Sequence, residues 1–156
     1  MNKPMFVYVT YIAATPDKVF KALTSQEATA KFWFGNAARS DWKVGSSIEF
    51  HRNGRLIIRG IVLENDPPRR LSYSFQSMHE PFNGGEPASR VIFELEPQKD
   101  QVKLTVTHDD FAPDSKVFPA ISNGWPLVLS SLKSYLEANR VLRAPWYEDE
   151  EQPAAS

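Results

Sequence analysis

The chain has 156 residues and a mass of 17.7 kDa, a size that fits a single folded domain with a substantial core. It contains no cysteine, which excludes disulfides, thiol nucleophiles and cysteine-bound metal clusters. The net charge is −1, but four consecutive acids, residues 148–151, follow the last basic residue, so the rest of the chain carries only about +3, too little to favour nucleic-acid binding.

The N-terminal part of the chain predicts one strand followed by two short helices. Residues 6–13 are rich in aromatic and β-branched side chains, as is typical of a strand. Thr15-Pro16-Asp17 supplies an N-cap, a first-turn proline and an acid for one helix. Ser25 can cap a second helix that runs towards Phe32. Residues 33–39 carry no pattern that assigns them.

From residue 38 to residue 108 apolar and polar side chains alternate, which is the period of half-buried strands. Asn53-Gly54 is the strongest turn signal, because a type I′ hairpin needs positive φ at both central residues. The strand that follows, residues 55–64, is apolar on both sides, so its inward face stays open. Further strands are predicted over 71–76, 90–96 and 102–108, with a loop at 77–88.

The last predicted element is a long amphipathic helix. Ile121, Trp125, Val128 and Leu132 lie three or four residues apart, and the helix should begin between Ser115 and Pro126 and end by Arg143. We therefore expect an α+β domain over residues 1–143, in which this helix covers an antiparallel sheet of about six or seven strands. Residues 144–156 are acidic and contain proline, and we expect a disordered tail there.

Several short sequence motifs resemble those of a known protein family. They include IAATPDKVF at 12–20, KFWF at 31–34, DPPRRLSYSF at 66–75, LTVTH at 104–108 and GWP at 124–126. In this order they resemble the helix-grip superfamily (START-like, SRPBCC), and within it the group related to the C-terminal domain of the activator of the heat-shock-protein-90 ATPase. The resemblance implies a curved sheet that grips the C-terminal helix around an apolar cavity. It also implies binding of lipid-like or aromatic molecules, cyclase or dehydratase chemistry, or a co-chaperone role.

The candidate site consists of side chains that should face this cavity. His108 lies on the inward face of its strand and could make a polar contact at the cavity mouth, or simply be satisfied by backbone or a neighbouring acid. The aromatic residues could line the cavity or fill the core. The predicted ligand-binding residues are Trp33, Phe50, Tyr73, Phe75, Phe93, His108, Trp125 and Leu129.

No pattern in the sequence points to a metal, a cofactor or a catalytic residue. The three histidines match no metal-ligand spacing, and His51 and His79 are predicted to face solvent. The preferred function is therefore the binding of a small hydrophobic molecule. The alternatives are a protein-interaction module of the co-chaperone kind, or a cyclase or dehydratase that uses the same cavity.

The sequence also predicts the cellular location of the protein. No stretch of 18 apolar residues could span a membrane, and the first residues have no signal-type apolar segment, so we expect a cytoplasmic protein. A protein partner and a homodimer are both compatible with the sequence.

Overall fold

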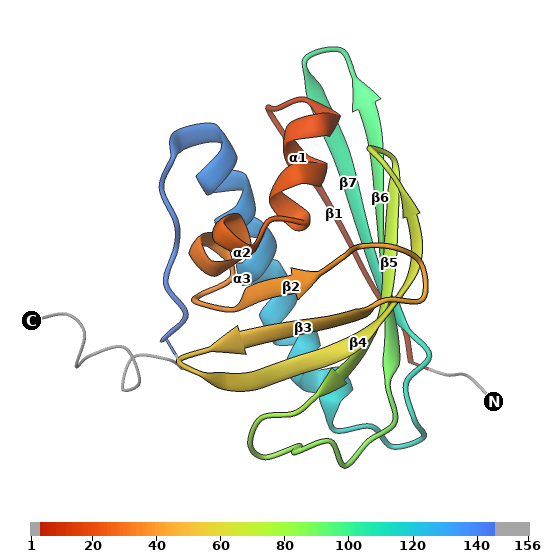
Figure 1. Cartoon of the computed structure of the whole chain (residues 1–156). Helices are drawn as coiled ribbons and strands as arrows, with labels where there is room; N and C mark the ends of the chain where they lie inside the picture. The colour runs from red at the N-terminus through yellow and green to blue at the C-terminus, as the bar shows by residue number, and fades with distance from the viewer. Residues whose placement is uncertain (1–3, 146–156) are drawn as a thin grey trace, which may run out of the picture.

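A computed structural model of the chain describes residues 4–145, which form an α+β domain. The order of elements is β1 (Phe6–Ile12), α1 (Pro16–Leu23), α2 (Gln26–Phe32), β2 (Ala37–Ser40), β3 (Ser47–Arg52), β4 (Arg55–Asp66), β5 (Arg70–Ser77), β6 (Ser89–Gln98), β7 (Gln101–Asp109) and α3 (Val117–Ala138). Within these residues the strands form one antiparallel seven-stranded sheet in the order β1-β7-β6-β5-β4-β3-β2. The sheet curves around α3, and α1 and α2 lie beside it (Figure 1). The predicted helix-grip architecture is confirmed.

The two short helices begin at the capping residues that the sequence predicts. Thr15 Oγ1 accepts from the backbone N–H of Lys18, and Ser25 Oγ accepts from the backbone N–H of Ala28. The first turn of α3 is held differently. Glu86, in the loop between β5 and β6, accepts from Ser115 Oγ at 2.6 Å and from the Lys116 N–H at 2.7 Å. This carboxylate therefore ties the β5–β6 loop to the start of α3.

Three backbone details shape β4 and its pairing with β3 and β5. Asn53 and Gly54 have φ of 53° and 76°, so the predicted type I′ hairpin between β3 and β4 is confirmed. The register of β3 and β4 then shifts between Phe50 and His51, so that Ile57 and Ile58 are both buried although they are adjacent. Gly60 lies so close to β5 that an added Cβ would be 1.8 Å from the Ser74 carbonyl oxygen, which only glycine allows.

The core lies between the concave face of the sheet and α3. Ile12, Phe50, Leu71, Phe93 and Leu132 are among its fully buried members.

The ordered packing continues past α3, which ends where Asn139 adopts a left-handed conformation. The Leu142 N–H donates to Ser131 Oγ at 3.1 Å, and Ala144 is buried. Ala144 falls within the tail predicted over residues 144–156, but its burial places it in the packed body. The rest of the predicted tail, residues 146–156, lies outside the described residues. None of the helices within residues 4–145 is long and apolar enough to cross a membrane.

Candidate functional site

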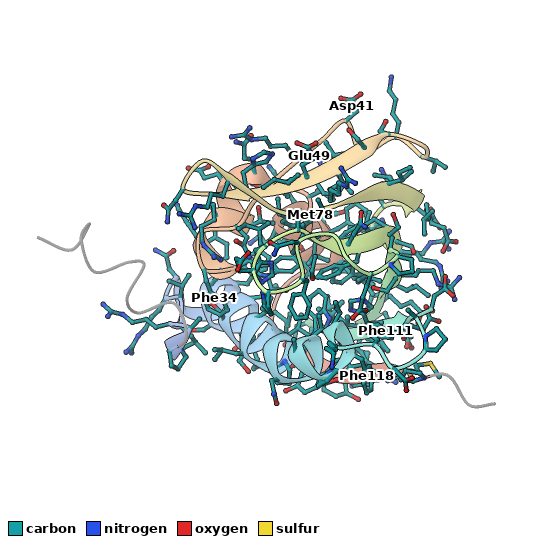
Figure 2. All side chains as sticks on the ribbon, turned by 90° about the horizontal axis from the view of Figure 1, so that it is seen from below. Phe34, Asp41, Glu49, Met78, Phe111 and Phe118 are labelled. Atoms are coloured by element: carbon teal, nitrogen blue, oxygen red, sulfur yellow. The ribbon has the colours of Figure 1, made fainter. Side chains whose placement is uncertain are left out.

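A pocket of about 480 Å³ lies between the first half of α3 and strands β4 and β5. Its apolar walls are formed by Trp33, Ile58, Phe75, Trp125 and Val128, which come from the end of α2, from both strands and from α3. Figure 2 looks at this end of the molecule, with the β5–β6 loop marked by Met78 and with Phe34 beside α3. The pocket thus lies between α3 and the part of the sheet that carries the longest loop.

Two tryptophans give the pocket its shape. The rings of Trp33 and Trp125 lie 5.1 Å apart, and Phe75 lies 6.4 Å from Trp125. Gly124 precedes Trp125 on α3 and also lines the pocket, and a Cβ added to it would meet nothing within 4 Å. The helix therefore leaves open space next to an aromatic wall.

The structure separates the eight predicted site residues into two groups. Trp33, Phe75 and Trp125 line the pocket. The other five lie in the core away from the pocket wall, each at most 1% exposed, because the curved sheet closes directly onto α3 there. These five are Phe50, Tyr73, Phe93, His108 and Leu129.

His108 lies inward as the alternation predicts, but it is fully buried and does not reach the pocket. Trp125 Nε1 donates to His108 Nδ1 at 3.0 Å, and an indole N–H is a donor only, so Nδ1 is an acceptor. The proton of the neutral ring is thereby placed on Nε2, which donates to Ser89 Oγ at 2.7 Å. Ser89 in turn donates to the Phe75 carbonyl oxygen at 3.1 Å.

This hydrogen-bonded chain joins α3 to β7, β6 and β5. Burial lowers the pKa of His108 to about 3, although nearby Asp109 opposes the shift. The ring therefore stays neutral near pH 7, and both of its nitrogens are engaged by protein groups. A contact to a ligand at the cavity mouth, one of our two interpretations of His108, does not fit this geometry.

The polar side chains that line the pocket include Arg52 and Asn36, neither of which is among the predicted site residues. Arg52 is only 7% exposed, and its Nη1 donates to Asn36 Oδ1 at 3.2 Å. The inward row of Ile48 and Phe50, continued by two residues, would have identified Arg52.

The two remaining histidines, which the sequence predicts to face solvent, are both half-buried. His79 lines the pocket, and its ring packs edge-on against Phe82, with the centroids 5.8 Å apart. His51 lies on the outer face of β3, where its Nε2 is 2.8 Å from Glu49 Oε1. Among residues 4–145, no group of three histidine or acidic side chains is arranged to hold a metal ion.

Comparison with known proteins places this architecture in a family. The sequence profile of the family described as activator of Hsp90 ATPase homolog 1-like protein matches residues 13–137. The chain belongs to this family. The match begins just after β1 and covers strands β2 to β7 and α3 up to Glu137, and thus every residue that lines the pocket.

Solved structures of other proteins share this fold. The solution structure of the Aha1 dimer from Colwellia psychrerythraea is 26% identical, with a TM-score of 0.70, over 86% of this chain and 97% of that one. A Mesorhizobium loti protein is 24% identical, with a TM-score of 0.74, over 88% and 100% of the two chains. An HSP90 activator from Plasmodium falciparum is 22% identical, with a TM-score of 0.65, over 78% and 86%. A comparison with curated protein sequences gives no significant match.

Proposed function

We propose that this protein binds a small, largely apolar molecule in the pocket between α3, β4 and β5. The observation that carries the proposal is the aromatic wall of Trp33, Phe75 and Trp125 beside an open volume of about 480 Å³. Ligand pockets have volumes of roughly 300–1,000 Å³ and are lined mainly by apolar and aromatic groups with a few polar ones. Gly124 supports the same interpretation, because a glycine within a helix costs stability but keeps this space free.

The expected affinity follows from the apolar area that a ligand could bury. A ligand that buries about 300 Å² of apolar surface gains about 7 kcal/mol before the cost of association. Because association itself costs about 4 kcal/mol or more, this apolar term alone supports an affinity in the millimolar range, and a tighter ligand needs polar contacts as well.

The proposal is tested by titrating the full chain with a flat apolar ligand while following tryptophan fluorescence. Occupation of the pocket should change the emission of Trp33 and Trp125 saturably, and should raise thermal stability by mass action. Gly124→Leu should fill the pocket and abolish both effects. Ala138→Leu, at the exposed end of the same helix, is the matched control and should bind like the wild type. Equal binding by wild type and Gly124→Leu would contradict the proposal.

A second candidate function, protein association, is favoured by the outer face of β1. Val7, Val9 and Tyr11 point outward along this edge strand and are between 43% and 53% exposed, an unusual row of large apolar side chains. The family relative from Colwellia psychrerythraea is described as a dimer. We propose a second copy of this chain as the partner of this face.

Sedimentation measurements test this second proposal. Val9→Lys should dissociate the dimer, whereas Val44→Lys, at an exposed site on the loop before β3, should not. A monomer at every concentration would reject the homodimer and would favour a different protein partner, such as the chaperone for which the family is named.

A further inference from the structure

Arg52 occupies an unusual position for a charged residue. It is the last residue of β3 and continues the inward row of Ile48 and Phe50, so its side chain points into the fold. Only 7% of its surface is exposed, whereas arginine is rarely buried in proteins. Arg52 thus forms part of the pocket wall, in the same lining as apolar side chains such as Ile58.

The backbone around Arg52 fixes the position of this side chain. The type I′ turn at Asn53-Gly54 follows directly and sets the end of β3. The side chain of Arg52 packs over Gly35, where an added Cβ would lie 3.3 Å from both Cγ and Cδ of the arginine. Gly35 has a φ of +92°, which favours glycine and leaves room for this aliphatic stem.

A second polar residue orients the guanidinium. Asn36, which is 2% exposed, accepts from Arg52 Nη1 through Oδ1 at 3.2 Å and also lines the pocket. A positioned guanidinium is a planar fork that matches the two oxygens of a carboxylate. Its attraction for an anion is also stronger in a partly water-excluded wall than on an open surface.

We propose that the ligand of this pocket carries an anionic end, in the simplest case a carboxylate, which Arg52 binds. Its apolar body then lies against Trp33 and Trp125. This inference rests on the proposed function and adds the chemical class of the ligand. The polar contact that the sequence analysis considered for His108 is thereby assigned to Arg52.

The test compares two probes that differ only at this end. 1-Naphthaleneacetate carries a carboxylate, and 1-naphthaleneacetamide is its neutral isostere. Calorimetric titration of the full wild-type chain should show the carboxylate binding about ten-fold or more tightly than the amide, because hydrogen bonds to charged groups are the stronger ones. This arm needs no mutation, so it does not depend on the folding of a variant.

Substitution of Arg52 supplies the second arm. Arg52→Gln should weaken binding of the carboxylate about ten-fold or more and leave binding of the amide unchanged, which also reports that the pocket is intact. Arg52→Lys keeps the positive charge but lacks the planar fork of donors, so its affinity for the carboxylate should lie between those of the wild type and Arg52→Gln. Arg55→Gln, the exposed arginine across the turn, is the matched control and should behave like the wild type.

The outcomes separate this inference from the function on which it rests. If both probes bind the wild type equally, the pocket binds apolar molecules but the anionic end is rejected. The same holds if Arg52→Gln weakens both probes to the same extent. If neither probe, nor a panel of other flat apolar carboxylates and amides, binds the wild type, the proposed function and this inference fail together.

Discussion

His108 and Arg52 are both inward-facing polar residues near the end of a strand, His108 on β7 and Arg52 on β3. In the half of the interface between the sheet and α3 that contains His108, which we call the closed half, the sheet closes onto α3. Each ring nitrogen of His108 has a protein partner there. In the other half, which contains Arg52 and which we call the open half, the sheet and α3 leave a pocket, and Arg52 is one of the residues that line it. An inward polar residue therefore indicates a ligand site only where the structure also leaves space beside it.

Trp125 is the residue at which the two halves meet. One of its neighbours is His108, which its Nε1 binds, and others are Trp33 and Phe75 on the pocket wall. The hydrogen bond to His108 in the closed half thus orients the Trp125 indole, and the same indole lines the pocket in the open half. Stability and binding should depend on different parts of this one side chain.

Substitution of Trp125 should produce the largest effect on stability. The side chain is only 3% exposed, so Trp125→Ala should lower the free energy of unfolding by about 3–5 kcal/mol. Trp125→Phe keeps most of the ring but leaves His108 Nδ1 without its donor, and should cost about 1–3 kcal/mol. Denaturant titration measures both losses. A loss below about 0.5 kcal/mol for Trp125→Phe would show that the hydrogen bond to His108 is unimportant.

The closed half should also control how stability depends on pH. The pKa of His108 is about 3 in the folded protein and near 6.5 when unfolded, so between these values only the unfolded chain binds the proton. Stability is therefore complete above pH 6.5 and is lost as the pH falls towards 3. The contribution of His108 should lower the free energy of unfolding by about 2 kcal/mol between pH 7 and pH 5.

His108→Gln isolates this contribution, because the other titrating groups are the same in both proteins. The variant should be less stable at pH 7, but its stability should change less than that of the wild type between pH 7 and pH 5. Urea titrations at pH 5, 6 and 7 give the comparison. Parallel pH profiles for the two proteins would show that His108 is protonated, or exposed, in the folded state.

The chain beyond Pro145 should have the smallest effect. Residues 146–156 have no periodic apolar pattern and include four consecutive acids, so a chain that ends at Pro145 should unfold at nearly the same denaturant concentration. The truncation keeps Ala144, which packs in the core. A large drop in the midpoint would assign Trp146 or Tyr147 to the folded body. Tighter binding of 1-naphthaleneacetate by the truncated chain would indicate that the acidic run competes for Arg52.

The fold could be predicted from the sequence wherever one local pattern decides the outcome. Alternation fixes β5, β6 and β7, and Asn53-Gly54 fixes a hairpin through its backbone geometry. The inward face of β4 could not be predicted, because the register shift opposite Ile57 depends on pairing with β3. Strand β2 was missed because its four residues are too few for a period and its pairing with β3 is non-local.

The site was harder to predict than the fold, because a pocket is the place where packing is incomplete. Alternation shows that Phe50, Tyr73 and Phe93 face inward, but only the curvature of the sheet decides whether they meet α3 or an open space. Arg52 was within reach of the sequence, since it follows Phe50 by two residues on the same face. It was overlooked because a charged residue at a strand end is usually exposed.

The most direct test of the pocket as the binding site is a ¹H–¹⁵N spectrum of the full labelled chain, recorded with increasing 1-naphthaleneacetate. The open half should respond, with the largest shifts at the indole N–H groups of Trp33 and Trp125 and at the amide of Gly124. The amides of Val7 and Val9 on β1 should stay in place. Shifts confined to β1, or no shifts at a concentration that saturates the calorimetric signal, would contradict the assignment of this pocket.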